Sequence, residues 1–281
     1  MDDVAIEVRG LRKSYRETVA VDGLDLQVRR GEVFALLGPN GAGKTTTVEI
    51  LEGYRSRDQG EVAVLGADPG HPSAAWRARI GIVLQSVNDA AELTVAEMVA
   101  HFTHYYPDPR DPDEVIDLVG LTAKRKARTR QLSGGQRRRL DVALGILGRP
   151  ELLFLDEPTT GFDPAARRQF WSLIRLLNDE DTTIVLTTHY LEEAEALADR
   201  VGVVKDGQIL AVGPPAHLGG RDRARATVSW TGPQGTESVQ TVSPTQVVTD
   251  LAGRFDGEIP DLIVRRPTLE DVYLDMIGER A

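Results

Sequence analysis

Nine consecutive residues have the composition of a phosphate-binding loop: Gly38, Pro39, Asn40, Gly41, Ala42, Gly43, Lys44, Thr45 and Thr46. Glycines let the backbone bend so that successive N–H groups point at phosphate oxygens, and the positive end of the following helix adds to the attraction. We expect Lys44 to bridge the β- and γ-phosphates of a nucleotide and Thr45 to offer its hydroxyl to Mg²⁺. A plain Gly-rich turn is the alternative. It does not explain why an apolar run precedes the loop and a helical pattern follows it.

Two acids form a second candidate site. Asp156 and Glu157 directly follow the apolar run Leu152–Leu155, which is typical of a buried strand. We expect Asp156, at the strand end, to hold the Mg²⁺ shell, and Glu157 to polarise an attacking water. Acids also end strands simply to reach solvent, but a phosphate-binding loop in the same chain favours the catalytic interpretation.

A third motif, Leu132-Ser133-Gly134-Gly135-Gln136, precedes the acids. Ser133 is a typical N-cap, and the residues from Gln136 to Leu144 continue as a helical pattern. A serine hydroxyl and glycine N–H groups at the positive end of a helix can receive a γ-phosphate. An ordinary helix start with two flexible glycines is the alternative.

In this order the motifs resemble the ABC-type ATP-binding domain over roughly residues 4 to 218. The resemblance implies that Tyr15 stacks on adenine, that Gln85 senses the metal and the membrane subunit, and that His189 contacts the γ-phosphate. It also implies that Asp163, in Gly161-Phe162-Asp163-Pro164, crosses to a partner subunit. Taken singly, these four residues are equally typical of a core aromatic, a surface glutamine, a strand-end histidine and a helix cap.

The same resemblance implies a head-to-tail homodimer. In ABC proteins, the Ser133-type loop of one subunit closes over the Lys44-type loop of the other, so that two ATP molecules with Mg²⁺ are buried between subunits. This chain has one copy of each motif and therefore needs a second copy of itself, or a homologue.

Strands and helices that alternate along the chain predict an α/β fold, a mostly parallel sheet flanked by helices, and the resemblance implies that it is of the P-loop NTPase (ABC ATPase) type. The predicted strands are Val4–Leu11, Leu24–Val28, Val33–Leu37, Glu61–Leu65, Ile80–Leu84, Leu152–Leu155, Thr183–Leu186 and Val201–Val204. Val33–Leu37 is apolar throughout and is expected to be buried on both faces. The first strands alternate apolar and polar residues, as half-buried strands do, and the resemblance implies that they form an antiparallel β subdomain. A helical insertion at about residues 86–150 completes a predicted ATP-binding domain of residues 1–218.

Residues 219–281 are predicted to form a small α+β C-terminal domain. Ala226–Trp230 and Ser238–Val242 have strand patterns, and Val247–Phe255 is compatible with a helix. Two helix starts carry a capping signature, Thr94 with Glu97 and Thr268 with Asp271. The second precedes an apolar stripe from Leu269 to Ile277, which could pack on its own domain or on another subunit.

Composition indicates in which cellular compartment the protein works and which partners it does not suit. The formal net charge of -10 disfavours nucleic-acid binding, and the absence of cysteine suits a reducing cytoplasm. The N-terminus Met1-Asp2-Asp3 is acidic, so no signal peptide is expected there. No apolar run approaches the roughly 20 residues of a membrane helix. We therefore expect a cytoplasmic protein, and the resemblance implies that it is peripheral on the inner face of the cell membrane and works with a separate membrane-spanning permease.

Two further segments, Leu140–Leu147 and Pro267–Leu274, resemble the daunorubicin-resistance type of ABC exporter. That branch implies efflux of drugs, antibiotics or lipid-like molecules, and hence multidrug efflux and antibiotic resistance. Two other functions are the alternatives. A soluble ABC ATPase of DNA repair or translation usually has long coiled coils or two ATPase cassettes, and neither is visible here. A binding-only regulatory subunit is disfavoured by the intact Glu157 and His189.

Overall fold

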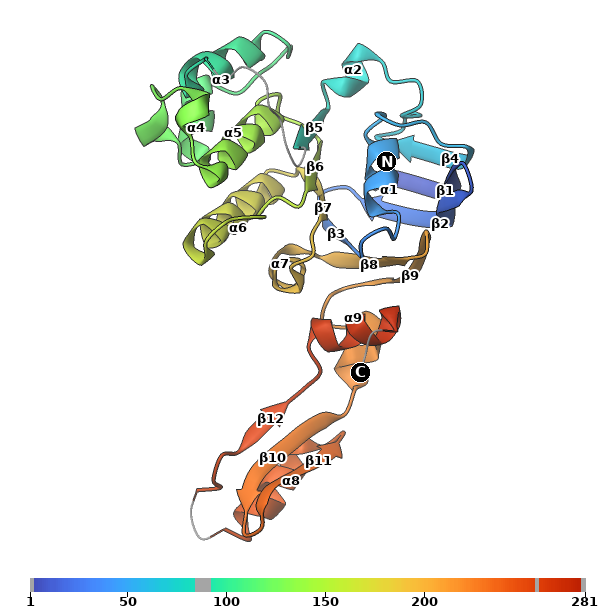
Figure 1. Ribbon diagram of the computed structural model, residues 1–281, viewed down its shortest axis with the longest axis vertical. Coiled ribbons are helices and arrows are strands. Elements are labelled where there is room, and N and C mark those ends of the chain that lie inside the picture. Colours follow the sequence, from blue (N-terminus) through green and yellow to red (C-terminus); the bar gives the residue numbers. More distant parts are fainter. Residues whose placement is uncertain (1–2, 84–91, 256–257, 279–281) are drawn as a thin grey trace. The chain divides into compact units, whose positions relative to one another are not determined.

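The computed structural model describes residues 3–83, 92–255 and 258–278, and these fall into two compact units, Met1–Val212 and Gly213–Ala281 (Figure 1). We describe each unit by itself. Among the described residues, no helix has both the length and the apolar composition that crossing a bilayer requires.

A six-stranded sheet forms the centre of the first unit, in the order β5-β6-β7-β3-β8-β9. Its strands are β3 (Val33–Leu37), β5 (Ile80–Val83), β6 (Leu152–Asp156), β7 (Thr183–Thr187), β8 (Arg200–Lys205) and β9 (Gln208–Gly213). β3 pairs in parallel with β7 and β8, and all five of its residues are buried, which confirms the prediction. β5, β6 and β7 are also parallel, so the carboxyl ends of β3, β6 and β7 lie along one edge.

A three-stranded antiparallel sheet confirms the predicted β subdomain. It consists of β1 (Val4–Tyr15), β2 (Thr18–Arg29) and β4 (Gln59–Val64), in the order β2-β1-β4. β1 and β2 are longer than predicted because the hairpin continues through several register shifts, where the apolar alternation is interrupted. Tyr15 is consequently the last residue of a strand.

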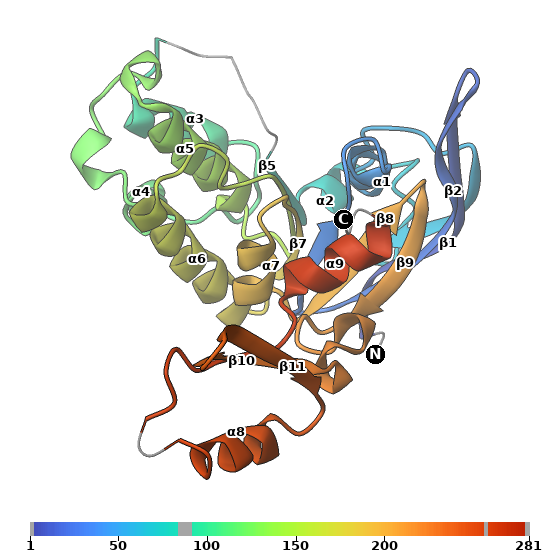
Figure 2. The ribbon, with the colours of Figure 1, turned by 60° about the horizontal axis from the view of Figure 1, so that its bottom comes forward.

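Helices flank the parallel sheet. They are α1 (Lys44–Leu51), α2 (Ala74–Arg77), α3 (Val95–Thr103), α4 (Pro112–Leu118), α5 (Gly134–Ile146), α6 (Pro164–Asp179) and α7 (Leu191–Leu197), with short 3-10 turns at η1 (Thr122–Lys124) and η2 (Thr129–Gln131). The capping box of Thr94 and Glu97 at the start of α3 is confirmed. In both ribbon views, α3, α4 and α5 lie on one side of strands β5 to β7, and α1 lies on the other (Figures 1 and 2).

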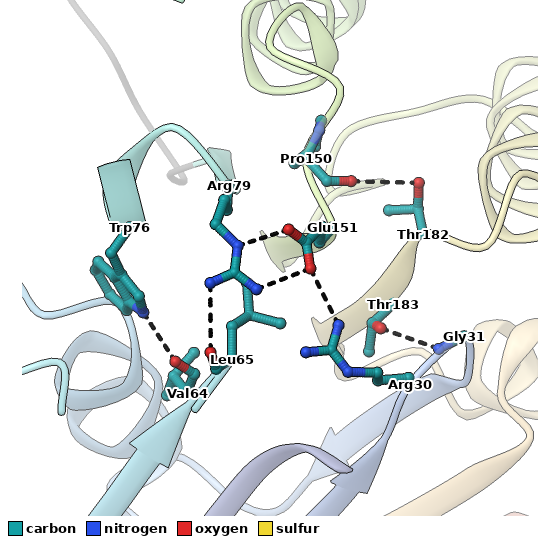
Figure 3. A network of polar contacts seen from close by, with 10 residues as sticks. All are labelled: Arg30, Gly31, Val64, Leu65, Trp76, Arg79, Pro150, Glu151, Thr182 and Thr183. Atoms are coloured by element: carbon teal, nitrogen blue, oxygen red, sulfur yellow. Dashed lines mark hydrogen bonds and ion pairs between the residues drawn. The ribbon is translucent and has the colours of Figure 1, made fainter. Parts of the chain in front are cut away.

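A polar network joins the two sheets of this unit near the amino ends of the parallel strands (Figure 3). Glu151, just before β6, accepts hydrogen bonds from Arg79 (2.5 and 2.9 Å) and from Arg30, directly after β2 (3.0 Å). Arg79 also donates to the Leu65 carbonyl beyond β4 (3.4 Å), and the neighbouring Trp76 indole donates to the Val64 carbonyl (2.8 Å). These contacts connect the antiparallel sheet to the strand that ends in the acid pair.

The second unit is a small α+β structure. β10 (Ala226–Gly232), β11 (Gly235–Thr241) and β12 (Ile263–Arg265) form an antiparallel sheet in the order β11-β10-β12, accompanied by η3 (Leu218–Arg223), α8 (Pro244–Ala252) and α9 (Leu269–Ile277). Its core contains Val228, Trp230, Leu251 and Ile259. The capping box of Thr268 and Asp271 is confirmed, whereas the helix predicted at Val247–Phe255 begins and ends three residues earlier.

Candidate nucleotide site

The loop that contains Lys44 connects β3 to α1, as its sequence context predicted. Gly43, the N-cap of α1, has a φ of 100°, and a Cβ placed there would lie 2.3 Å from the Ala20 carbonyl oxygen. A Cβ at Gly38 would lie 2.3 Å from the Val204 carbonyl oxygen. Only glycine is therefore compatible with this loop at both positions. Because Gly43 has no side chain, the first N–H groups of α1 are left for an external acceptor.

The Lys44 ammonium lies inside the loop and donates to the carbonyls of Gly38 (2.7 Å) and Pro39 (2.9 Å). Burial lowers its pKa, while the carboxylates of Glu157 and Asp156 oppose that shift. In the structure, Lys44 and the two acids are thus close enough for their charges to interact. Thr45, one residue further, is exposed on the first turn of α1.

The two acids are neighbours in sequence but are oriented differently by the backbone. Asp156 ends β6 and accepts a hydrogen bond from the Thr187 hydroxyl at the end of β7. Glu157 has a φ of 44°, an unfavourable left-handed conformation for a residue with a side chain. Its N–H donates to the Thr187 carbonyl and hydroxyl oxygens, both at 3.1 Å, which holds this conformation.

Two predicted catalytic groups meet beyond this turn. The Glu157 carboxylate lies 3.5 Å from Nδ1 of His189 and accepts a hydrogen bond from the Thr160 hydroxyl (3.3 Å). The Glu157 side chain is 24% exposed and that of His189 is 50% exposed, so both can be reached from solvent. A nearby buried acid, Glu52, has its pKa raised to about 8 by burial and by the charges of Asp156 and Glu49. It therefore holds its proton at neutral pH and adds little negative charge there.

The residues around Asp156 suit Mg²⁺. Carboxylate and hydroxyl oxygens are its preferred protein ligands, and a nucleotide-associated Mg²⁺ needs only one or two of them because phosphates and water supply the others. Asp156 carries a carboxylate and Thr45, at the start of α1, a hydroxyl of this kind. No group of three or more His, Cys, Asp or Glu that could hold a metal exists among the described residues.

Ser133 caps α5 as predicted. Its hydroxyl accepts from the Gln136 N–H (3.3 Å), and the Gln136 side chain accepts from the Ser133 N–H (3.1 Å). Ser133 and Gly134 are exposed, and none of the hydrogen bonds or ion pairs of the described residues joins residues 133–136 to the loop of Lys44. Within the described part of one chain, these two motifs are thus not joined by such a bond.

Asp163 is the N-cap of α6, and its carboxylate accepts from the N–H groups of Ala165 (2.9 Å) and Ala166 (2.8 Å). The preceding Phe162 is buried and meets Phe170 edge-on, with ring centroids 5.9 Å apart. The same ring lies 3.7 Å from where a Cβ of Gly135 would be. The Asp163 loop thus packs against the Ser133 loop.

Two further residues were predicted for the nucleotide site, Tyr15 and Gln85. Tyr15 is 36% exposed at the end of β1, with the Arg55 guanidinium 5.3 Å and the Lys13 ammonium 5.5 Å from its ring centre. Gln85 lies outside the described residues.

Sequence reasoning missed two residues of this site. Thr187 is described above. Arg138 is a buried arginine of α5 that donates to the carbonyls of Asp156 and of Pro158 (3.2 Å). It links the Ser133 helix to the acids. No sequence pattern distinguishes Arg138 from its neighbours Arg137 and Arg139. Thr187 does carry a signal, because it is a threonine at the end of a predicted buried strand.

Comparison with known proteins adds independent findings. A family model described as ABC transporter matches residues 21–160. The chain is 38% identical to daunorubicin resistance ATP-binding protein DrrA3 of Streptomyces coeruleorubidus and 39% identical to Nod factor export ATP-binding protein I of Rhizobium sp. (strain N33), in each case over 99% of this chain and 98% of the relative.

Solved structures show the same fold. CbiO1 from Clostridium perfringens, part of the ABC transporter complex cbiONQ, is 28% identical, with a TM-score of 0.67 over 76% of this chain and 90% of that one. A dimeric bacterial ABC transporter cassette is 24% identical, with a TM-score of 0.67 over 74% of this chain and 98% of that one.

Proposed function

This chain belongs to the ABC transporter family of ATP-binding proteins, and from that membership we propose that it powers export of a drug, antibiotic or lipid-like molecule through a separate membrane permease. Its ATPase fold is that of the family. The relatives named above are resistance and export proteins that match nearly the whole chain, so they favour an exporter over an ATPase of DNA repair or translation. The chain would then be peripheral on the cytoplasmic face of the membrane.

One observation carries the catalytic part of the proposal: the Glu157 carboxylate lies 3.5 Å from Nδ1 of His189. We propose that Glu157 accepts a proton from the attacking water and that His189 contacts the γ-phosphate. Lys44 and the N–H groups at the start of α1 would receive the phosphate charge as it develops. Mg²⁺, held by Asp156 and Thr45, would neutralise phosphate charge when bound.

The remaining predicted residues have roles that need a second subunit or the nucleotide. We propose that Ser133 and the glycines after it face the γ-phosphate of ATP in a second copy of the chain, in a head-to-tail dimer. The exposure of Ser133, and the absence of any hydrogen bond or ion pair between it and the Lys44 loop among the described residues, support this arrangement. Asp163 would lie at the same interface, Tyr15 beside the adenine, and Gln85 beside the metal and the permease.

Phosphate release by purified protein tests the proposed chemistry. Glu157→Gln should bind ATP with unchanged affinity but lose more than 100-fold in turnover, because a positioned base contributes about 10²- to 10⁴-fold. Lys44→Ala should lose tight ATP binding, with Lys126→Ala, an exposed lysine, as its control. Glu61→Gln, an exposed acid on β4, is the control for Glu157. A Glu157→Gln protein that hydrolyses ATP near the wild-type rate would refute the assigned base.

A further inference from the structure

The second unit contains a pocket of about 700 Å³, lined by residues of its sheet, of η3 and of α9. Strand pairing sets the floor of this pocket. Thr227 of β10 lies opposite both Gln240 of β11 and Arg265 of β12, and directly paired residues share one face of a sheet. Val228, the next residue of β10, faces the other way into the core with Leu251 of α8. The floor is thus the polar face of the sheet, and α8 packs on the opposite face.

Apolar side chains of α9 form one wall of the pocket. Val272 and Met276, one helical turn apart, line it together with Gly219 of η3. A Cβ placed at Gly219 would lie 2.5 Å from atoms of both side chains, so η3 and α9 are in direct contact and the wall exists before any ligand binds. Ile263 of β12, which is 59% exposed, adds apolar surface to the lining. A volume of this size suits one small organic molecule.

Three arginines line the pocket, Arg225, Arg265 and Arg266, together with two acids, Asp271 and Asp275. This excess of positive charge contrasts with the formal net charge of the chain, which is -10. Arg225 is exposed, and within residues 3–83, 92–255 and 258–278 it takes part in no hydrogen bond or ion pair. Its guanidinium donors are therefore available to a ligand.

Arg265 can also turn to a ligand at little cost. It donates to Asp271 Oδ2 (3.2 Å), but the same oxygen accepts from the N–H and the hydroxyl of Thr268, both at 2.8 Å. The capping box of α9 therefore still satisfies Asp271 when Arg265 leaves. The Arg265 side chain is 64% exposed, and an ion pair at such a position contributes little stability.

We propose that this pocket binds an amphipathic anion, which is a molecule with a carboxylate or phosphate group on an apolar body. Arg225 and Arg265 hold the acidic group, because guanidinium groups form strong paired hydrogen bonds with carboxylate and phosphate. Ile263, Val272 and Met276 cover the apolar body. A nucleic acid fits less well, because the chain is acidic and the pocket has apolar walls. The inference concerns the second unit alone and does not depend on the proposed export function.

Isothermal titration calorimetry of the full chain with dodecanoate, below the concentration at which it forms micelles, tests this proposal. We expect saturable binding, and binding at least roughly tenfold weaker for acetate, which lacks the apolar body, and for dodecyltrimethylammonium, which reverses the charge. The Lys44→Ala protein should bind dodecanoate as tightly as wild type does. That result separates the pocket from the nucleotide site.

Two substitutions in the pocket locate the binding. Arg225→Gln should weaken dodecanoate binding at least roughly tenfold, because it removes a charge-assisted hydrogen bond. Ile263→Asp should also weaken it, because it places a like charge beside the ligand. Arg254→Gln is the matched control, because Arg254 is an exposed arginine just after α8 that does not line the pocket. Circular dichroism checks that each variant folds.

Sedimentation with vesicles distinguishes two sources of such an anion. Binding to phosphatidylglycerol vesicles but not to phosphatidylcholine vesicles, lost in Arg225→Gln, identifies a membrane lipid. Dodecanoate binding without vesicle binding identifies a free amphiphile. No binding of either probe, an affinity that Arg225→Gln leaves unchanged, or equal affinity for dodecyltrimethylammonium would overturn the inference and leave the export function standing. Failure to recover any membrane subunit would refute the export function and leave this inference in place.

Discussion

At the scale of single residues, the site depends on the backbone conformation that separates Asp156 from Glu157. The left-handed φ of Glu157 turns its side chain toward His189, while Asp156 remains at the strand end with Thr187. Such a conformation costs of order 1 kcal/mol or more and persists only where other contacts hold it. Thr187 supplies those contacts from the neighbouring strand. Its hydroxyl donates to the Asp156 carboxylate and accepts from the Glu157 N–H, and its carbonyl also accepts from the Glu157 N–H.

We therefore predict that Thr187→Val lowers the ATP turnover rate by roughly tenfold or more, because the loss of a positioning hydrogen bond displaces Glu157 from the attacking water. Thr187→Ser keeps the hydroxyl and should retain most of the activity. Steady-state phosphate release at saturating ATP measures both variants. A Thr187→Val enzyme as fast as Thr187→Ser would show that the hydroxyl does not position the acids.

At the scale of elements, much of the site was predictable because its signals are local. Gly38 to Thr46 identify a loop between a strand and a helix, and the Ser133 and Thr94 capping boxes depend on residues three apart. Contacts between distant elements were not predictable. Arg138 reaches the carbonyls after β6 from α5, and nothing in the sequence indicates which of three consecutive arginines points inward. Likewise, the register of the β1–β2 hairpin, and not its apolar pattern, determines that Tyr15 ends a strand.

The Glu151 network between the sheets gives an element-scale prediction about pH. Arg79 and Arg30 hold the pKa of Glu151 below its ordinary value. A lowered carboxyl pKa contributes stability that is present above the unfolded pKa of about 4.3 and is lost as the pH falls through the folded value. Because the pair is partly exposed, solvent screening limits the contribution to about 1 kcal/mol. Glu151→Gln should thus unfold at lower urea concentration than wild type at pH 7.

The difference between Glu151→Gln and wild type should shrink as the pH falls from about 4.3 through the lowered pKa of folded Glu151, because the unfolded carboxyl binds its proton first and the folded one only at lower pH. Glu61→Gln, at an exposed acid of β4, provides the comparison. Urea titrations at pH 7 and at acidic pH values measure both. A Glu151→Gln protein with wild-type stability at pH 7 would show that the network does not stabilise the junction of the two sheets.

At the scale of the whole molecule, the chain contains two compact units with separate hydrophobic cores. Side chains of β1 to β4, α1 and the parallel sheet form the larger core, and side chains of β10 and α8 contribute to the smaller one. All residues of the candidate nucleotide site lie in the first unit. We propose that Met1–Val212 is the ATP-binding domain and that Gly213–Ala281 is a domain that folds around its own core.

Differential scanning calorimetry of the full chain tests this division. We predict two transitions, of which the larger moves to higher temperature when ATP and Mg²⁺ are added to Glu157→Gln protein, which binds but does not hydrolyse. A ligand present at 100 times its dissociation constant stabilises the binding unit by about 2.7 kcal/mol. The smaller transition should not move. One cooperative transition that shifts as a whole would contradict the proposal of independent domains.

The central claim is that this ATPase drives a membrane permease. It is tested most directly by expressing a tagged copy in the native host, solubilising the membranes gently, and identifying the proteins that co-purify. The account predicts recovery of a polytopic membrane protein in a stable ratio to this chain. Recovery of ribosomes, DNA or other soluble partners alone would leave the ATPase chemistry in place and contradict the transport function.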